Sequence, residues 1–560
     1  STFTMAPPRS FAERYAKDRA WRARRARVTR LVAVSVVAAL VVGWTLFAVF
    51  AVARLKPNTV PPPPIVVDEP SSPSSPSVPA EEETVRRRDP LDVEVDPRTQ
   101  LEVPRFWRPP LEEEDEEEDL VRGEPTIFVM IASYRDFQCR ETVTSALSRA
   151  SRPWRIRVGV VEQNADDDVK CDEPVEPCAA NPSQPLCSFR SQVDVYRMHA
   201  SKASGPIYAR HVGNRMYRGE AFAMQLDAHV QFIKDWDDLI VEQWRATGND
   251  MAVLSTYLTD LQGSIDSAGR STRKTRPIMC NSNFEGSFPA RYLRHGAQPE
   301  EVPAIKGSPM LQPFWAAGFS FSRGHFVRKV PYDCCLPQVF MGEEISIGIR
   351  AWTFGYDLYA TESSVVFHEY AQKSQRRRGV HMFWEQKHGK GESASRSLLR
   401  LTSVIKMLPP SDAAIGTGGD DNSIDQTDIH KYGLGSERDV DLFYKLFLVD
   451  VQHRRAQPLC KFVKTGVMHR DFSAHLRRNG RGIDYSNLVD YDTKAAIDAE
   501  LNTNWRPRAR RGLTRAIEMN EIGWLRNAID AADRAEIAAS DPALLDRARD
   551  ALHKLQNKPH

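Results

Sequence analysis

Short apolar runs that end in polar residues alternate with helical patterns between residues 125 and 410. The runs at 126–134 (TIFVMIASY) and 155–164 (RIRVGVVEQN) have the length and the polar ending of buried parallel strands. The stretch at 141–150 between them has helical spacing, which completes a strand–helix–strand unit. This alternation predicts an α/β fold built on a parallel sheet.

The same alternation continues after residue 200. Residues 206–219 are predicted to be helical, and 219–232 (GEAFAMQLDAHVQF) to be a buried strand that breaks at its polar end. Further strands are predicted at 251–258 and 365–370. In open α/β sheets, ligands bind at the carboxyl ends of the strands. The polar groups expected at this edge are those at 134–136, 162–164 and 227–229.

Beyond residue 407 the pattern changes. Residues 410–425 are rich in Gly, Asp and Ser, which indicates a loop. Residues 436–455 and 512–556 have the composition and spacing of helices. We therefore expect a sheet domain at 125–407 and a mostly helical C-terminal region at 408–560.

Residues 31–53 contain no charged side chain and are long enough to cross a hydrocarbon layer of about 30 Å as a helix. Nine Arg and Lys residues lie between 9 and 30, against Arg54 and Lys56 just after the run. Because basic residues stay on the cytosolic side, this asymmetry predicts a cytosolic tail at 1–30 and a type II transmembrane anchor.

The segment at 54–124 holds little apolar material. It contains PPPP, SSPSSPS and an acid run, EEEDEEED, at 112–119. Such composition is typical of extended, disordered linkers, so we expect a Pro-rich and acidic stem between the anchor and the sheet domain.

Charge and cysteine content narrow the class further. The 76 Lys and Arg nearly balance the 74 Asp and Glu, so no global field points to nucleic acid. None of the eight cysteines forms a CxxC pair, which disfavours a zinc ribbon or finger. Cys171, Cys178 and Cys187 lie in a Pro-rich loop, where a disulfide would require an oxidising lumen. Buried or free thiols are the alternative.

The first candidate for chemistry is the triplet Asp227-Ala228-His229 at the end of an apolar run. In an extended chain, residues two apart point to the same side, so the carboxylate and the imidazole can approach one ion together. Asp and His are suitable ligands for a divalent metal that holds a diphosphate. The bare D-x-H pattern is common, so the residues around it must show whether it is a metal site.

The sequence around this triplet resembles that of a known family. The stretch at 203–244 carries GP followed by AR, a YRGE turn, LDAH and WD, and is similar to the UDP-GlcNAc:protein α-N-acetylglucosaminyltransferases that modify hydroxyproline or threonine. That family is distantly similar to polypeptide GalNAc-transferases. The resemblance covers roughly 125–400. Its other blocks are IASYRD (131–136), WAAGFSFSRGHF (315–326), VFMGEEISIGIRAWTFGYDLYA (339–360) and FHEY (367–370).

The resemblance implies a GT-A type nucleotide-sugar-binding fold and a UDP-sugar donor. By position, Asp227, His229 and His368 would ligate Mn²⁺ or Mg²⁺. The alternative for His368 is an imidazole whose hydrogen bonds are satisfied within the sheet.

Glu343 and Glu344, in MGEE, correspond by the same resemblance to a segment that contacts the donor sugar or places the acceptor. We therefore expect them to be catalytic. The alternative is that these carboxylates begin the helix predicted after them, since acids are favoured at helix N-termini.

The resemblance also suggests residues around the nucleotide. Arg135 and Asp136 end the first strand, where uridine and ribose are expected, and Arg210 would pair with the diphosphate because a guanidinium binds phosphate bidentately. Trp315 would form a wall of the sugar pocket. Either arginine could instead be a surface charge, and aromatic residues at such spacing are more often core.

Together these features predict a metal-dependent transferase that moves GlcNAc from UDP-GlcNAc to a Thr, Ser or hydroxyproline hydroxyl of a protein. The resemblance implies retention of configuration by front-side attack. The anchor favours a luminal Golgi location. Alternatives are a related transferase for UDP-GalNAc or UDP-galactose, and an inactive glycan-binding homologue. A metal hydrolase is disfavoured because HExxH is absent from the sequence.

Overall fold

The computed structural model describes residues 92–108, 119–286, 291–370, 374–377, 380–383, 390–408 and 424–557. The predicted cytosolic tail, the predicted span at 31–53 and most of the predicted stem lie outside these residues. Within the described part of the chain, no helix has the length and apolar character needed to cross a membrane.

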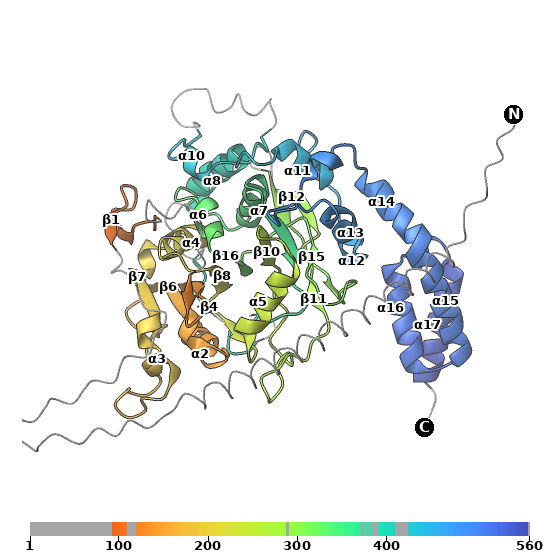
Figure 1. Cartoon of the computed structure of the whole chain (residues 1–560), viewed down its shortest axis with the longest axis horizontal. Coiled ribbons are helices and arrows are strands. Elements are labelled where there is room, and N and C mark those ends of the chain that lie inside the picture. The colour runs from red at the N-terminus through yellow and green to blue at the C-terminus, as the bar shows by residue number, and fades with distance from the viewer. Residues whose placement is uncertain are drawn as a thin grey trace, which may run out of the picture. The chain divides into compact units, whose positions relative to one another are not determined.

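An eight-stranded sheet forms the centre of the fold (Figure 1). Its strands, in spatial order, are β15 (Met310–Leu311), β17 (Asp357–Ala360), β10 (Ala252–Ser255), β16 (Phe319–Arg323), β8 (Phe222–Asp227), β5 (Ile127–Tyr134), β6 (Ile156–Asn164) and β7 (Val193–His199).

Parallel pairing joins β8, β5, β6 and β7, whereas β16 runs antiparallel between β8 and β10. Of these, β5 and β6 are buried on both faces along most of their length, which is why they appear as nearly unbroken apolar runs in the sequence. The predicted α/β class with a large sheet is confirmed, with three antiparallel pairings added to it.

Two predicted strands differ in detail from the structure. The run at 219–232 divides into β8 and β9 (Val230–Phe232), because the chain leaves the main sheet after Asp227. The run at 365–370 gives β18 (Val366–His368), which pairs with β9 in a separate two-stranded sheet. This small sheet brings His368 opposite Val230 and therefore close to His229.

Helices cover the sheet as the sequence predicts. The expected helices at 141–150 and 206–219 are present with shifted bounds, and a helix begins at Glu343, within MGEE. The helices of this part are α2 (Cys139–Ser148), α3 (Pro185–Ser188), α4 (Pro206–Asn214), α5 (Trp236–Ala246), α6 (His325–Lys329) and α7 (Glu343–Thr353).

Residues 92–108 form a hairpin, β1 (Val93–Val95) with β2 (Glu102–Pro104), within the segment for which an extended stem is expected. The hairpin packs on α4. Tyr208 donates a hydrogen bond to Asp96 at 2.7 Å, and Val103 is fully buried in a cluster with Tyr208. These contacts make the hairpin part of the folded unit, which begins well before residue 125.

The region after residue 407 has two parts. The helices α11 (Val440–Leu446), α12 (Cys460–Lys464), α13 (Val467–Ser473) and α14 (Thr493–Glu500) contribute to the main core, which extends in sequence from Ile127 to Leu501. The helices α15 (Arg506–Met519), α16 (Ile522–Arg534) and α17 (Pro542–Gln556) pack on one another around a core of their own. The helix predicted at 436–455 is α11 followed by a hairpin.

The remaining helices and strand pairs lie around these parts in sequence. They are α8 (Lys390–Val404), α10 (Ile429–Tyr432) and the strand pairs β3 (Leu120–Val121) with β4 (Glu124–Pro125), β11 (Arg276–Pro277) with β14 (Glu300–Glu301), β12 (Ser282–Glu285) with β13 (Tyr292–His295), and β19 (Val449–Asp450) with β20 (Arg455–Ala456).

All eight cysteines are paired in disulfides, so the alternative of free thiols is not realised. The bond between Cys280 and Cys460 joins the sheet domain to α12 across 180 residues and limits how far the two parts can separate. The other pairs are Cys139–Cys171, Cys178–Cys187 and Cys334–Cys335.

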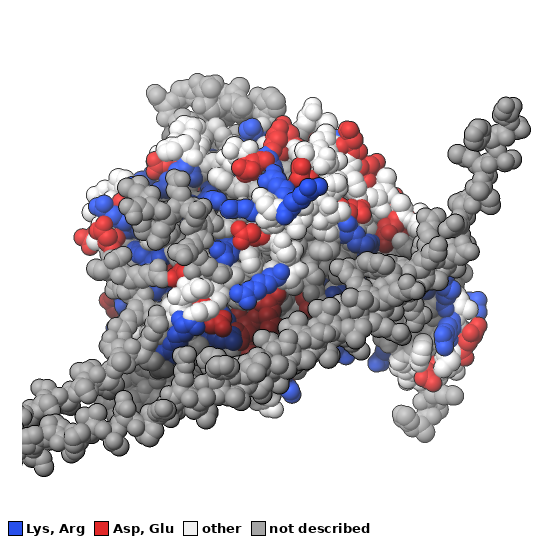
Figure 2. All heavy atoms as spheres, viewed as in Figure 1, with Lys and Arg blue, Asp and Glu red and all other residues white. Residues whose placement is uncertain are grey.

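Basic and acidic side chains are interspersed on the face shown in Figure 2, and neither sign covers it. This distribution agrees with the nearly balanced charge of the sequence.

Candidate active site

Three side chains from two adjoining sheets meet where β8 ends. Asp227 is the last residue of β8, His229 lies in the turn to β9, and His368 ends β18. The Nε2 atom of His368 is 3.5 Å from Oδ2 of Asp227, and the two imidazole ring centroids are 4.3 Å apart. One ligand atom from each residue lies within 4.8 Å of the others. The structure thus brings together the three residues predicted as metal ligands.

The donor set fits a divalent cation. One carboxylate and two imidazoles form a common ligand set for first-row divalent metals. Gly318 passes so close that a Cβ there would be 2.9 Å from Oδ2 of Asp227, so the backbone leaves room only for the carboxylate. Among the described residues, one other group is close enough to share an ion, Asp333 with Cys334 and Cys335, but its two sulfurs are bonded to each other.

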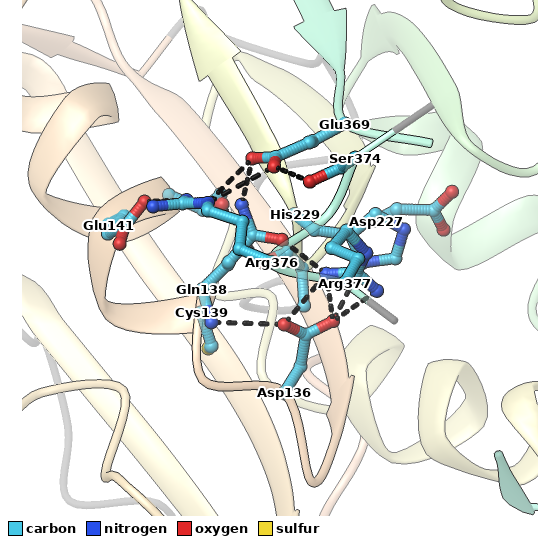
Figure 3. A network of polar contacts seen from close by, with 12 residues as sticks. Asp136, Gln138, Cys139, Glu141, Asp227, His229, Glu369, Ser374, Arg376 and Arg377 are labelled. Atoms are coloured by element: carbon cyan, nitrogen blue, oxygen red, sulfur yellow. Dashed lines mark hydrogen bonds and ion pairs between the residues drawn. The ribbon is translucent and has the colours of Figure 1, made fainter. Parts of the chain in front are cut away.

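Asp136, which is expected near the ribose, contacts a predicted metal ligand. Its Oδ2 lies 2.8 Å from Nδ1 of His229, and the guanidinium of Arg377 lies 3.1 Å from both carboxylate oxygens (Figure 3). Burial by itself would raise the pKa of Asp136, but the hydrogen bond to His229 and the charge of Arg377 outweigh it and lower the pKa to about 2.

Asp227 and His368 are also held in the forms that bind a metal. Burial raises the pKa of Asp227, yet its hydrogen bond with His368 and the charge of Arg210 prevail and hold that pKa well below its usual range. Burial, followed by the charge of His229, lowers the pKa of His368. A carboxylate and a neutral imidazole are therefore favoured, which are the protonation states that metal ligands require.

Arg210, expected to face a diphosphate, is engaged within the protein. It lies on α4 with only 6% of its surface exposed. Its Nη2 donates to Oδ1 of Asp227 at 2.8 Å, and its Nη1 donates to Oε1 of Glu343 at 2.5 Å. Arg210 thus bridges a predicted metal ligand and a predicted catalytic carboxylate.

Glu343 and Glu344 occupy the first turn of α7 but face different partners. Burial raises the pKa of Glu343, against the opposing charge of Arg210. Glu344 accepts hydrogen bonds from the Tyr257 hydroxyl and the Ala317 backbone N–H, both at 2.8 Å, and burial raises its pKa to about 7. Both carboxylates line the cavity described next, so their place at the start of a helix does not remove them from the site.

A cavity of about 560 Å³ joins these groups. Its size lies within the range of small-molecule sites. The metal-ligand cluster, Asp136, Arg210 and both glutamates line it. Tyr134 and Gln163, from the strand ends expected at this edge, line it as well. Lining residues that the sequence did not indicate include Tyr257, Arg294, His295, Phe340, Met341, Tyr370, Arg377, Val380, His381, Met382 and Phe383.

Two predicted site residues lie elsewhere. Arg135 is absent from the described cavity lining and donates instead to Asp168 at 2.7 Å, in the loop that follows β6. Trp315 has 1% of its surface exposed and packs edge-on against Tyr332 in the core. The structure therefore favours the surface ion pair for Arg135 and the core packing for Trp315, both of which the sequence left as alternatives.

An α/β sheet has a carboxylate and two imidazoles at its edge, beside a cavity that both charged and apolar side chains line. These are donor groups of the kind that a divalent cation and an anionic ligand would need. A family model described as "Glycosyltransferase (GlcNAc)" matches residues 126–184 and 173–453, which together exceed half of the 560 residues. The chain belongs to this glycosyltransferase family, and the predicted glycosyltransferase class is confirmed.

Comparison with curated proteins gives no match. Among solved structures, GalNAc-T7 with UDP, GalNAc and Mn²⁺ is similar at 16% identity and a TM-score of 0.38, over 60% of this chain and 58% of that chain. The chain thus spans less than two thirds of the GalNAc-T7 chain. Staphylococcus aureus TarS 1–349 in complex with UDP-GlcNAc is similar at 12% identity and a TM-score of 0.30, over 77% of this chain and 91% of that chain. At these scores the likeness defines neither ligand nor reaction.

Proposed function

We propose that this glycosyltransferase moves GlcNAc from UDP-GlcNAc to a Thr, Ser or hydroxyproline hydroxyl of a protein acceptor. The observation that carries the proposal is the meeting of Asp227, His229 and His368 at the rim of the cavity. A nucleotide-sugar donor brings a diphosphate that needs a counter-charge, and this cluster would hold Mn²⁺ or Mg²⁺ for that purpose. When bound, such an ion stabilises negative charge on the departing diphosphate.

The remaining groups suit the donor sugar and the acceptor. In the proposed reaction, the bond from the anomeric carbon to UDP breaks, a bond to the acceptor oxygen forms, and the acceptor proton passes to the leaving phosphate. Retention would follow from front-side attack. Glu343 and Glu344 are the carboxylates that we assign to holding the sugar and placing the acceptor, since both line the cavity.

A donor panel with and without chelator tests this proposal. Purified protein with UDP-GlcNAc and Mn²⁺ is expected to release UDP in the presence of hydroxyl-bearing peptides, at least tenfold faster than with UDP-GalNAc or UDP-galactose. EDTA should remove the activity, and added Mn²⁺ should restore it. Faster turnover of another UDP-sugar would identify that sugar nucleotide as the donor in place of UDP-GlcNAc. Binding without turnover of any donor would support an inactive glycan-binding homologue instead.

We further propose a type II Golgi topology with the catalytic domain in the lumen. The uncharged run at 31–53 and its flanking basic residues motivate it, and four disulfides suit an oxidising compartment. In sealed microsomes, protease should spare the catalytic domain until detergent is added. Deleting residues 1–56 should release a soluble protein. Cleavage of the domain in intact microsomes, or membrane association of the shortened protein, would contradict this topology.

A further inference from the structure

The carboxylate of Asp136 lies at the turn between β5 and α2, and donors surround it. Its Oδ2 is 2.8 Å from Nδ1 of His229, and its Oδ1 accepts the backbone N–H of Gln138 at 3.0 Å (Figure 3). The residue is 5% exposed, so water does not compete for these contacts. Asp136 is thus held as an acceptor from two sides.

Arg377 completes the arrangement from a distant part of the sequence. It belongs to the segment that follows His368 and is 4% exposed. Its Nη1 lies 3.1 Å from both oxygens of Asp136, its Nη2 lies 3.1 Å from Oδ2, and Nη1 also donates to the side chain of Gln138. A planar guanidinium in this position fixes the plane of the carboxylate. Figure 3 shows Arg377 and His229 both directed at Asp136.

These contacts determine which nitrogen of His229 faces the cavity. Both oxygens of Asp136 lie 3.1 Å from the guanidinium of Arg377, which can only donate, and this contact makes the carboxylate the acceptor. Nδ1 of His229 then carries the proton that it shares with Asp136. The lone pair then lies on Nε2, the atom left for a metal. A carboxylate behind a ligating histidine is a recurrent means of fixing the tautomer and ring orientation of the ligand. His368 lacks such support, because its Nδ1 has no hydrogen-bond partner among the described residues.

We propose that Asp136 is a positioning residue that fixes the tautomer and orientation of His229, and that Arg377 holds Asp136 in place for this task. The affinity of the site for its cation then depends on a carboxylate that is not itself a ligand. This inference rests on the proposed metal-dependent function. It replaces the role at the ribose that the sequence suggested for Asp136, since both oxygens already have partners within the protein.

Direct metal binding by the full-length purified protein tests the inference without measuring turnover. Titration of Mn²⁺ into the metal-free protein, followed by calorimetry, is expected to show about 10- to 100-fold weaker binding for Asp136→Ala than for the wild type. Asp136→Asn should lose less, because its amide oxygen still accepts from Nδ1 but carries no charge. The visible absorption bands of bound Co²⁺ should shift in both variants, since the orientation of His229 changes.

Two matched variants serve as controls. Asp168→Asn removes the charge of another carboxylate that is paired with an arginine, Arg135, outside the cavity lining. Arg376→Gln removes the neighbouring guanidinium, which forms ion pairs with Glu369 and Glu141 rather than with Asp136. Both should bind Mn²⁺ as the wild type does. Thermal unfolding of the metal-free proteins identifies any variant that fails to fold, and Asp136→Asn serves as the test if Asp136→Ala does not fold.

The outcomes separate this inference from the proposed function. If the wild type binds Mn²⁺ and His229→Ala abolishes binding, but both Asp136 variants bind normally, the positioning role is overturned and the metal site stands. If the Asp136 variants keep their affinity for Mn²⁺ but bind UDP more weakly in EDTA, the results would support a contact between Asp136 and the ribose. Failure of the wild type to bind Mn²⁺ would overturn the proposed metal dependence and this inference with it.

Discussion

The Asp227→Ala variant is expected to lose about 1,000-fold or more of the kcat/KM for sugar transfer. Asp227 supplies the only carboxylate among the three predicted ligands. A bound metal contributes several kcal/mol of charge stabilisation to such a reaction, and each 1.36 kcal/mol corresponds to a factor of ten in rate. Arg210 keeps its second partner, Glu343, at 2.5 Å, so the fold should survive the substitution.

The measurement is UDP release with UDP-GlcNAc and peptide over a range of Mn²⁺ concentrations. Asp250→Asn is a suitable control, because Asp250 is also half-buried and ion-paired, with Arg323 at 3.9 Å, but lies outside the described cavity lining. It should retain activity close to the wild type. Metal-stimulated turnover by Asp227→Ala at the wild-type rate would remove Asp227 from the site.

The parts of the fold that the sequence predicted are those whose signal is local. Each of the strands β5 and β6 is a continuous apolar run because it is buried on both faces of the sheet, and the helix α7 begins at two acidic residues that favour a helix start. Such features depend on neighbours in sequence, so composition and spacing are sufficient to identify them.

The hairpin at 92–108 shows where local signals fail. Its strands are three residues long, and it is stabilised by contacts with α4, such as that of Tyr208 with Asp96, 112 residues apart. The sequence around it is rich in Pro and charge, which locally favours an extended linker. The sequence of the segment itself carries no signal for the surface on which the hairpin packs.

The site residues likewise divide into those with a local signal in the sequence and those without one. Asp227 and His229 were candidates because they share one short strand end, and the resemblance of their neighbours made them the predicted ligands. His368 was predicted by resemblance alone. Arg377 is 241 residues from Asp136 and lies in a run, QRRRG, where nothing distinguishes it from two neighbouring arginines. Trp315 was placed in the sugar pocket because sequence cannot show on which side of a strand-ending loop an aromatic ring lies.

The Arg210→Ala variant is expected to lower the free energy of unfolding of the metal-free protein by about 3–5 kcal/mol, the usual cost of removing one partner of a buried ion pair. Arg210 is 6% exposed and bonded to Asp227 and Glu343, so its loss leaves two carboxylates near each other without a cation. Arg210→Lys should cost less, because it keeps the charge but cannot form both bonds with one planar group.

The measurement is denaturant unfolding in EDTA, with Arg135→Ala as the control. It distinguishes an Arg210 that bridges Asp227 and Glu343 from an Arg210 that binds the diphosphate, as the sequence suggested. Arg135 is the other arginine assigned to the nucleotide, but it is more exposed, at 22% of its side chain, and pairs with Asp168, so its loss should cost about 1 kcal/mol or less. A bridging Arg210 predicts the large loss of stability in the absence of any nucleotide. An Arg210 that serves only the diphosphate predicts unchanged unfolding and a raised KM for the UDP-sugar. Because Arg210 joins the metal-ligand cluster to the first turn of α7, the bridging role makes the relative position of Asp227 and Glu343 a property of the folded chain before any donor binds.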